Sequence, residues 1–377
     1  MKLLLVSHSG GFYGAEKSLL TVAKGLSERG HDVCVVVPNQ GKLREELKRE
    51  NISVTVWRYY GWLGRENRIS KGAFRFIFNL ISGFWFFVAK KPKVDFIYTN
   101  TVTTPFGVIV SFFSRTKHIW HVREFVHEDM GAEFDLPKKI TSFLYFLNFW
   151  CSIYNSVSVQ KKFQGYFGTH KSEVIYNAIE LPDKTLECHA RELSEIDAVK
   201  LSMVSSLHEG KGHVDAIHAL PHVLRRYPNC VLSIVGSGND EYVKSIKKLI
   251  FEKRLENNIE LLGYMDNPLH IMAESDAFLM CSRNEAFGRV TLEAMSIGCP
   301  VVGARSGGTQ ELLEFGKYGL LYKPGDCDDL GEKILVLLLN KNSREKYSRI
   351  SKKKALDFSS NAVVDGIVNV LENTATH

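Results

Sequence analysis

Short runs of β-branched and other apolar residues recur along the whole chain, separated by longer stretches whose apolar residues are spaced as in helices. The first half has five such runs, at residues 2–7, 32–38, 52–57, 94–100 and 117–122. The second half has six, at residues 199–207, 229–238, 259–265, 276–282, 299–304 and 319–326. Strands that alternate with helices are typical of a parallel sheet with crossover helices. The pattern predicts an α/β protein with two Rossmann-like, doubly wound domains.

The border between these domains is predicted near residue 180. A chain of 377 residues exceeds what one hydrophobic core usually fills. Within residues 173–184, an apolar strand runs into Asn177, Pro182 and Asp183 before a charged stretch. Such a change is typical of a linker. The predicted domains therefore cover residues 1–180 and 181–355.

The cysteines and the first residues favour a cytoplasmic protein. Seven cysteines lie far apart, without a CxxC pair or a nearby histidine cluster. This spacing is typical of a reducing compartment and excludes a disulfide framework or a zinc site. The opening sequence MKLLLVSHSGG has one lysine and no small-residue cleavage site. It is interpreted as a buried first strand, because a signal peptide would carry such a site.

The charges are unevenly distributed. Residues 1–180 contain 24 Lys and Arg against 15 Asp and Glu, whereas residues 181–377 contain 24 against 27. A basic N-terminal half suits an anionic partner such as a membrane surface or a phosphate group. No nucleic-acid partner is expected.

Two aromatic-rich segments of the first half bear on membrane contact. Residues 72–89 contain seven aromatic residues and one charge, Arg75, and the basic sequence KKPK follows them. The segment is marginal for a membrane span. It is predicted as a helix or helix pair whose aromatic and basic face lies on a membrane surface, with a core helix as the alternative. With the second segment, residues 142–154, it favours a lipid-linked acceptor at the cytoplasmic leaflet.

A glycine-rich turn follows the first predicted strand. Gly10, Gly11 and Gly14 separate this strand from a helix. Backbone N–H groups and a positive helix end can bind an anion there, so a phosphate site is predicted. The alternative is a turn that only lets the strand and the helix pack. The spacing is not G-x-G-x-x-G, which weakens a dinucleotide-binding interpretation.

The sequence NEAFGRVTLEAMSIGCPVV, residues 284–302, carries the main chemical signal. Arg289 to Ile297 have helical apolar spacing, Gly298 suits a left-handed cap and Pro300 prevents continuation. Glu285 precedes this helix and Glu293 lies in it. Eight residues of helix would span about 12 Å, which is too far to share one small cation. The two acids could instead hold the ends of an extended ligand whose diphosphate rests on the N–H groups at the start of the helix, from Gly288 to Leu292.

This E-x7-E sequence, with GARSGGTQELL and GKYGLLYKPGD after it, resembles the retaining glycosyltransferases of family 4. The sequences VSSLHEGKGHVDAIHAL, LSIVGSGNDE and IELLGYMDN are similar to the family's other donor-side segments in order and spacing, and SGGFYGAEKSLL is similar to its N-terminal Gly-rich loop. The resemblance implies a GT-B fold, in which two Rossmann-like domains face each other across a cleft. It also implies that a last helix, about 356–377, packs back on the first domain.

The resemblance assigns roles by position. Glu285 matches the acid that bonds the donor sugar, Lys211 matches the lysine on the diphosphate, and Glu293 matches the acid that accepts from the ribose. The other implied donor-binding residues are Phe287, Gly288, Arg289, Leu292, Tyr264 and Gly236. Five residues before Lys211 the family usually has an arginine, whereas this chain has Ser206. His208 or Arg289 could take the place of that missing arginine.

The acceptor side is less clearly marked. The sequence KHIWHVREFVHED ends a strand, and the family has a histidine or other polar residue after that strand, facing the donor sugar. His121 is the preferred candidate, with Arg123 and Glu124 as alternatives and a structural histidine as a third. The Asp-Cys-Asp sequence at 326–328 is interpreted as a loop and helix cap, so no metal is predicted.

The predicted function is a metal-independent, retaining sugar transfer from a nucleoside-diphosphate sugar to a hydroxyl of a glycan in polysaccharide or glycoconjugate synthesis. A UDP-sugar is weakly favoured as the donor, and a polyprenyl-diphosphate-linked glycan is the expected acceptor. Beyond the donor sugar no cofactor is expected. The alternatives are a nucleotide-sugar epimerase or hydrolase of the same fold, and a binding protein without catalysis. The protein is expected on the cytoplasmic face of the membrane, as a peripheral protein.

Overall fold

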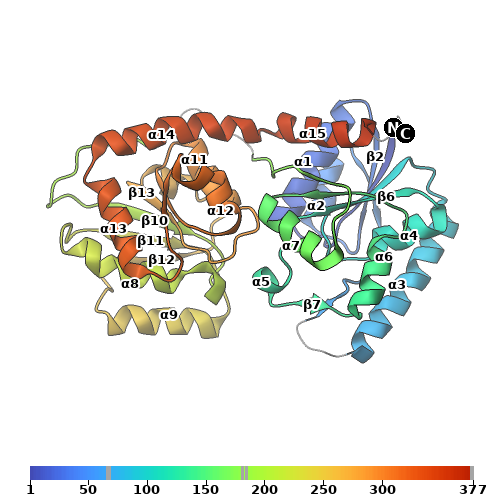
Figure 1. Cartoon of the computed structure of the whole chain (residues 1–377), viewed down its shortest axis with the longest axis horizontal. Helices are drawn as coiled ribbons and strands as arrows, with labels where there is room; N and C mark the ends of the chain where they lie inside the picture. Colours follow the sequence, from blue (N-terminus) through green and yellow to red (C-terminus); the bar gives the residue numbers. More distant parts are fainter. Residues whose placement is uncertain (65–68, 180–181, 183–185, 374–377) are drawn as a thin grey trace. The chain divides into compact units, whose positions relative to one another are not determined.

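The computed structural model describes residues 1–64, 69–179, 182 and 186–373. It forms two compact units (Figure 1). The N-terminal unit comprises Met1–Ala178 together with the segment from Ser360 onward, and the C-terminal unit comprises Ile179–Ser359. The predicted border at residue 180 and the predicted helix end at 374–377 lie outside the described residues.

The N-terminal unit is built on a seven-stranded sheet in the order β3-β2-β1-β5-β6-β8-β9, with all neighbouring strands parallel. This order places the first strand next to a reversal of winding direction, as in doubly wound folds. The strands are β1 (Lys2–Val6), β2 (Asp32–Val37), β3 (Ser53–Val56), β5 (Phe96–Thr99), β6 (Lys117–Val122), β8 (Phe149–Tyr154) and β9 (Ser172–Val174). A separate antiparallel pair consists of β4 (Leu63–Gly64) and β7 (Glu133–Phe134).

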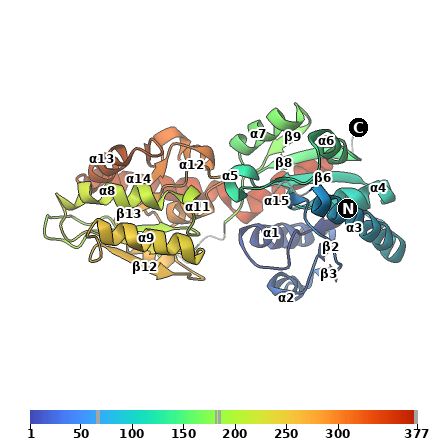
Figure 2. The ribbon, with the colours of Figure 1, turned by 90° about the horizontal axis from the view of Figure 1, so that it is seen from below.

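Helices cover both faces of this sheet (Figures 1 and 2). In α1, the residues Leu19, Val22, Ala23 and Leu26 follow helical spacing and are buried, so one stripe of the helix faces the core. They share a cluster with Val364 of the last helix. The helices are α1 (Gly14–Glu28), α2 (Lys42–Arg49), α3 (Ile69–Lys90), α4 (Phe106–Ser114), α5 (His127–Met130), α6 (Lys138–Tyr145), α7 (Val157–Phe167) and α15 (Ser360–Glu372).

The C-terminal unit has a six-stranded parallel sheet in the order β12-β11-β10-β13-β14-β15. Its strands are β10 (Lys200–Val204), β11 (Val231–Val235), β12 (Ile259–Gly263), β13 (Ala277–Met280), β14 (Val301–Ala304) and β15 (Leu320–Tyr322). Its helices are α8 (His213–Leu224), α9 (Asp240–Glu252), α10 (Leu269–Ala273), α11 (Arg289–Ser296), α12 (Gly307–Leu312), α13 (Cys327–Leu338) and α14 (Lys341–Ala355). Three short 3₁₀ turns cover Glu209–Lys211, Glu314–Gly316 and Leu356–Phe358.

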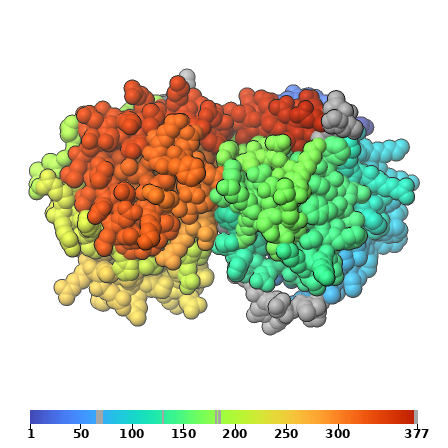
Figure 3. All heavy atoms as spheres, viewed as in Figure 1, coloured from blue at the N-terminus to red at the C-terminus, as the bar shows by residue number. Residues whose placement is uncertain are grey.

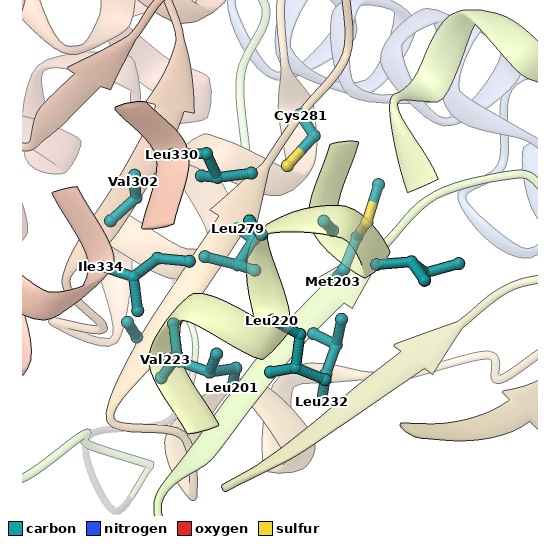
Figure 4. Close-up of a cluster of buried hydrophobic side chains, with 14 of the residues drawn as sticks. Leu201, Met203, Leu220, Val223, Leu232, Leu279, Cys281, Val302, Leu330 and Ile334 are labelled. Carbon is teal, nitrogen blue, oxygen red and sulfur yellow. The ribbon is translucent and has the colours of Figure 1, made fainter. Parts of the chain in front are cut away.

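The core of the C-terminal unit lies between β10, β11, β13 and β14 and the helices α8 and α13 (Figure 4). Its members are almost completely buried, and the labelled ones are Leu201, Met203, Leu220, Val223, Leu232, Leu279, Cys281, Val302, Leu330 and Ile334. At about 25 cal/mol for each Å² of apolar surface removed from water, such a cluster is the main source of the unit's stability. This core holds the ends of β10, β11 and β13, from which the loops of the candidate site begin.

All eleven predicted strands are confirmed; β6 has the predicted bounds and the other ten are shorter than predicted. The segment 72–89 is one helix, α3, so the possibility of a helix pair is wrong. The prediction for 142–154 also needs correction, because this run ends α6 and then forms β8, an interior strand between β6 and β9. Tyr145, Cys151 and Ile153 are completely buried there. An interior strand is apolar because it packs on both faces, so most of this run belongs to the core.

Candidate functional site

The two motif acids lie at the carboxyl-terminal edge of the sheet in the C-terminal unit. Glu285 belongs to the loop between β13 and α11, and Glu293 lies in α11. Gly288 begins the helix with φ 91°, a left-handed conformation that disfavours any other residue. In open parallel sheets, ligands bind outside the carboxyl ends of the strands. The predicted helix and the predicted left-handed Gly298 are both confirmed, the latter with φ 74°.

Glycines of α12 fix the backbone of the Glu285 loop. The N–H of Gly308 donates to the carbonyl oxygen of Glu285 at 2.7 Å. A Cβ atom on Gly307 would lie 2.2 Å from that same oxygen, and one on Gly308 would lie 2.4 Å from the carbonyl oxygen of Phe287. Such distances exclude a side chain at either glycine. Sequence analysis included this Ser-Gly-Gly in the motif but gave it no role, although paired glycines at a helix start are a signal for close backbone approach.

Lys211 and Glu285 form an ion pair. Lys211 ends a 3₁₀ turn after β10, and its Nζ lies 2.8 Å from Oε2 of Glu285. The side chains are 19% and 17% exposed, so both can reach a ligand. Gly212, with φ 73°, brings this loop against the end of β13, where a Cβ atom would lie 2.1 Å from the carbonyl oxygen of Cys281. The structure thus brings together the two donor-side residues that the resemblance made catalytic.

Glu293 forms a second, separate ion pair. Its Oε1 accepts from Nε of Arg289 at 2.9 Å, one helical turn earlier. The two side chains are 20% and 26% exposed. The motif acids therefore lie in different ion pairs, each with a cation that a ligand could replace. Because Arg289 bonds Glu293, its predicted use in place of the missing arginine would require that contact to open.

The remaining donor-side residues surround the same strand ends. Phe287 and Leu292 are buried, and the Phe287 ring lies 6.3 Å from that of Phe358. Gly236 follows β11 and donates its N–H to the carbonyl oxygen of Gly263, the last residue of β12, at 2.8 Å. Tyr264 comes next, with a side chain that is 62% exposed. An exposed aromatic ring at a strand end is available for a base or a sugar.

Three residues near this edge bear on the missing arginine. Ser206 is exposed and His208 is partly buried. Arg283 was missed by sequence analysis, although it lies two residues before Glu285 in the motif. Its backbone N–H donates to Gly210 at 3.0 Å, and its half-exposed guanidinium bonds the buried carboxylate of Asp215 at 3.1 Å. The neighbouring Asp215 raises the pKa of this guanidinium. Arg283 is thus a permanent positive charge on the loop that carries Glu285.

The glycine-rich turn after β1 contains a buried carboxylate of its own. Gly10 and Gly11 form the turn and Gly14 is the first residue of α1. The side chain of Glu16 is 2% exposed and accepts from the hydroxyl of Ser9 at 2.8 Å and from the N–H of Tyr13 at 2.9 Å. An acid at this position satisfies N–H groups at a helix start. Glu16 thus uses donors that a phosphate would need, and the phosphate site remains a prediction.

The acceptor-side candidates are buried at the end of β6. His121 has no exposed surface, and its Nδ1 contacts the hydroxyl of Tyr98 and, at 3.2 Å, the guanidinium of Arg123. Arg123 also donates to Asn100 at 2.8 Å and to Asn177. Burial and the adjacent Arg123 hold the pKa of His121 well below its usual value, so the ring is neutral. A buried neutral ring of this kind fits the structural alternative for His121.

Glu124 holds a loop in place. Its two carboxylate oxygens accept from the N–H of Val102 at 2.7 Å and from that of Arg123 at 3.1 Å. The side chains of Arg123 and Glu124 are 8% and 5% exposed. The structure thus brings His121, Arg123 and Glu124 into a polar cluster that connects the ends of neighbouring strands.

The Asp-Cys-Asp sequence caps a helix, as predicted. The side chain of Asp326 accepts from the N–H of Asp329 at 3.1 Å at the start of α13. Within the described ranges, no group of three or more His, Cys, Asp or Glu side chains could hold a metal ion.

Two family models match the chain, one in each unit. "Glycosyltransferase Family 4" matches residues 12–182, and "Glycosyl transferases group 1" matches residues 189–354. The poly(glycerol-phosphate) alpha-glucosyltransferase of Bacillus subtilis is 33% identical over 166 residues, which are 42% of this chain and 24% of that protein. The N-acetylgalactosamine-N,N'-diacetylbacillosaminyl-diphospho-undecaprenol 4-alpha-N-acetylgalactosaminyltransferase of Campylobacter jejuni is 31% identical over 194 residues, half of each chain. The chain thus spans half or less of the length of these relatives.

Solved structures extend the similarity over the whole chain. Anabaena HepE in complex with UDP has a TM-score of 0.80 and 25% identity, and the match covers 99% of this chain and 100% of HepE. The TarM protein has a TM-score of 0.74 and 14% identity, and the match covers 98% of each chain. At this identity the similarity supports the fold alone. With a family model on each unit and two Rossmann-like sheets like those of these neighbours, the chain belongs to the family 4 glycosyltransferases of the GT-B fold.

Proposed function

We propose that this protein transfers a sugar from a nucleoside-diphosphate sugar, preferentially a UDP-sugar, to a hydroxyl group of a glycan acceptor, with retention of configuration and without a metal ion. The observation that carries the proposal is the ion pair between Lys211 and Glu285, at 2.8 Å, on the carboxyl-terminal edge of a parallel sheet. The complex of HepE with UDP supports the choice of donor.

Each member of the pair has a task in the donor complex. Lys211 contacts the diphosphate, where negative charge grows as the bond between the sugar C1 and the phosphate oxygen breaks. Glu285 accepts hydrogen bonds from the sugar hydroxyls and so orients the sugar for departure. The N–H groups at the start of α11 add positive potential to the diphosphate. A lysine and a helix end supply the charge that a metal would otherwise provide, which supports the metal-independent proposal.

Glu293 holds the nucleoside. When the ribose enters, its hydroxyls donate to the carboxylate of Glu293, which here accepts from Arg289 at 2.9 Å. The guanidinium of Arg289 then turns toward the diphosphate and supplies part of the charge that is missing at Ser206. The cost of the exchange is small, because both side chains are partly exposed before the donor binds.

A lipid-linked acceptor is supported by the surface of α3. Six large apolar residues of this helix are 39–64% exposed: Phe74, Ile77, Ile81, Phe84, Trp85 and Val88. They follow helical spacing and form one face, called the α3 face below. Figure 3 shows the light-blue atoms of α3 at the surface of the N-terminal unit. Lys71, Lys90, Lys91 and Lys93 stand at its ends. An apolar face flanked by lysines fits the interface of an anionic membrane, so we propose peripheral binding at the cytoplasmic leaflet.

The length of α3 permits another arrangement. Among the described residues, one helix is long and apolar enough to cross a membrane, and it covers Lys71–Lys90 with a mean hydropathy of 1.5. Its other side, however, packs in the N-terminal unit. Asn79 is completely buried and bonds the backbone of Tyr60, and Ser82 bonds the indole of Trp57. A helix held in this way by buried polar contacts is better suited to lie on a membrane than to span it.

Donor screening tests the proposal. Thermal shift with UDP-, GDP- and ADP-sugars should give the largest stabilisation with a UDP-sugar, because ligand binding to the folded state raises Tm. The preferred donor should then label a lipid-linked glycan in the presence of EDTA, with the anomeric configuration of the product read by NMR. Donor consumption without an acceptor would indicate an epimerase or hydrolase. Tight donor binding without turnover on any acceptor would indicate a binding protein.

A further inference from the structure

A cavity of about 520 Å³ lies in the N-terminal unit, between the connection from β6 to α6 and helix α7. Apolar side chains form most of its wall, among them Phe125, Phe134, Leu136, Phe163 and Tyr166. The volume is in the range of small-molecule sites, which combine an apolar lining with a few polar groups. Neither the donor-side residues nor the three acceptor-side candidates belong to this wall.

The wall is held in a strained conformation. Val126 has φ 71° and ψ −71°, and the N–H of His127 donates to the carbonyl oxygen of Phe125 at 3.0 Å. This is a γ-turn, which is rare and costly for a β-branched residue. Strain of this kind persists where the surrounding structure holds it, and it is concentrated at binding sites. Another part of the wall is also held in place. Phe134 belongs to β7, which pairs with β4, and its ring packs edge-on against that of Trp62 with 5.3 Å between the ring centres.

The cavity lies beside the acceptor-side cluster and beside α3. Phe125 directly follows Glu124, so one wall continues from the end of β6. Asp135, in another wall, accepts from Arg75 of α3 at 2.9 Å. A Cβ atom on Gly72 of α3 would lie 2.7 Å from Cβ of Asp135, so helix and wall are in close contact. A ligand in the cavity would therefore bridge the membrane-facing helix and the strand ends.

Two lysines, Lys138 and Lys162, and two acids, Glu133 and Asp135, belong to this largely apolar wall. Lys138 has its Nζ 4.7 Å from the centre of the Tyr166 ring, and Lys162 pairs with Glu128 and lies over Phe125. The side chain of Asp135 is 5% exposed, and its Oδ2 is without a hydrogen bond among the described residues. Because Asp135 is paired with Arg75, the ammonium groups of Lys138 and Lys162 can meet an anionic head group, while the apolar side chains of the wall suit the tail of an amphiphile.

We propose that this cavity binds the isoprenoid segment next to the diphosphate of a polyprenyl-diphosphate-linked acceptor, with Lys138 and Lys162 at the diphosphate. The inference rests on the proposed function, since it names the part of the acceptor that the N-terminal unit recognises. The isoprenoid chain enters past α3, and the glycan extends toward the end of β6.

Titration calorimetry with farnesyl diphosphate, below its aggregation concentration and in saturating UDP, tests the cavity on the full chain. Lys138→Glu should weaken binding roughly tenfold or more, because a charge-assisted contact is replaced by repulsion. Leu136→Trp should weaken it by a similar factor, because the indole fills the cavity. The matched control is Lys139→Glu, which changes the neighbouring exposed lysine outside the wall and should leave the affinity within about twofold. Inorganic diphosphate and farnesol should each bind more weakly than farnesyl diphosphate.

Three results would overturn the assignment: equal losses in Lys138→Glu and Lys139→Glu, unchanged binding in Leu136→Trp, or equal affinity for inorganic diphosphate and farnesyl diphosphate. The Tm of each variant without ligand reports its folding, and the shift of Tm by UDP reports its donor binding. If UDP stabilises every variant but farnesyl diphosphate does not bind, the cavity proposal fails and the donor proposal stands. If the predicted pattern appears without any effect of UDP, the donor proposal fails instead.

Discussion

Charged residues at the strand ends are held differently in the two units. In the C-terminal unit, Lys211 and Glu285 keep 19% and 17% of their side chains exposed and form a salt bridge. In the N-terminal unit, Arg123 and Glu124 are 8% and 5% exposed and bond backbone groups and asparagines of neighbouring strand ends. The first pair can exchange its contact for a ligand at low cost, whereas a movement of the second cluster would leave buried polar groups without their partners.

A position at a strand end is therefore insufficient for a catalytic role. A charged group in a reaction must reach a ligand, so it must give up its resting partner at low cost. Partly exposed ion pairs contribute about 0–1 kcal/mol, while a buried polar group left without its partner costs about 1–3 kcal/mol. Substitutions should therefore reduce turnover in the C-terminal unit and stability in the N-terminal unit.

The largest effect is expected for Glu285→Gln. This change keeps the size of the side chain but removes the charge to which the proposed function gives the orientation of the donor sugar. We expect kcat to fall roughly ten- to a thousandfold at saturating substrates, with little change in donor affinity or in Tm. Glu293→Gln is the control in the same motif and should weaken donor binding more than it slows turnover. If Glu285→Gln turned over normally, Glu285 would have no catalytic role, and the expected contrast between turnover in the C-terminal unit and stability in the N-terminal unit would fail.

Eleven strands could be predicted from the sequence, because each depends on a local pattern, whereas the roles of the donor-side residues stay predictions. Apolar runs indicate buried strands, and the spacing of Glu285, Gly288 and Glu293 around a helix start is itself the signal. The Lys211 to Glu285 contact spans 74 residues and needed the resemblance. Arg283 was overlooked because an arginine outside the family's pattern carries no spacing signal.

On the acceptor side, sequence analysis could name residues but could not determine their burial. The sequence KHIWHVRE is equally consistent with a strand that has a functional end and with a core strand. The burial of His121 depends on its neighbours, among them Tyr98 and Arg123. The run 142–154 was misread for the same reason. An interior strand and a membrane-facing segment have similar composition, and only the pairing of β8 with β6 and β9 distinguishes them.

Arg123→Met should lower the free energy of unfolding by roughly 1–3 kcal/mol for each group that loses its partner, here Asn100 and Asn177. Urea denaturation followed by circular dichroism measures the loss. The turnover of the molecules that remain folded should change much less. If the variant is as stable as the parent but inactive, Arg123 acts on the acceptor, and the N-terminal cluster is functional after all.

Mild acid should destabilise the N-terminal unit more than the C-terminal unit. Burial lowers the pKa of His118 to about 3 and that of His121 well below its usual value, whereas in the C-terminal unit burial lowers the pKa of His213 to about 4. A histidine with a lowered folded pKa contributes stability that is present above the unfolded pKa of about 6.5 and is lost as pH falls below it. Between pH 6.5 and 5.5, each such histidine should lower the free energy of unfolding by about 1 kcal/mol.

Native-state hydrogen exchange at pH 6.5 and 5.5, with peptides assigned to each unit, would measure this difference. Protection in β5 and β6 should fall by at least about 1 kcal/mol more than protection in β10 and β11, since two completely buried histidines act in the first unit and one in the second. Equal losses in both units would show that the N-terminal histidines are accessible to protons, contrary to their burial.

The smallest effect concerns the surface of the N-terminal unit. Trp85→Ser removes a ring of the α3 face that is 57% exposed, and Phe251→Ser removes a 71% exposed ring of the C-terminal unit as a matched control. Binding to anionic vesicles should weaken by about 1 kcal/mol, roughly fivefold, in the first variant only, because only the α3 face enters the lipid. High salt should release part of either protein by screening the lysines. If the protein binds neutral and anionic vesicles equally well, these lysines have no role in binding. If Trp85→Ser and Phe251→Ser weaken binding equally, the α3 face has no special part in it.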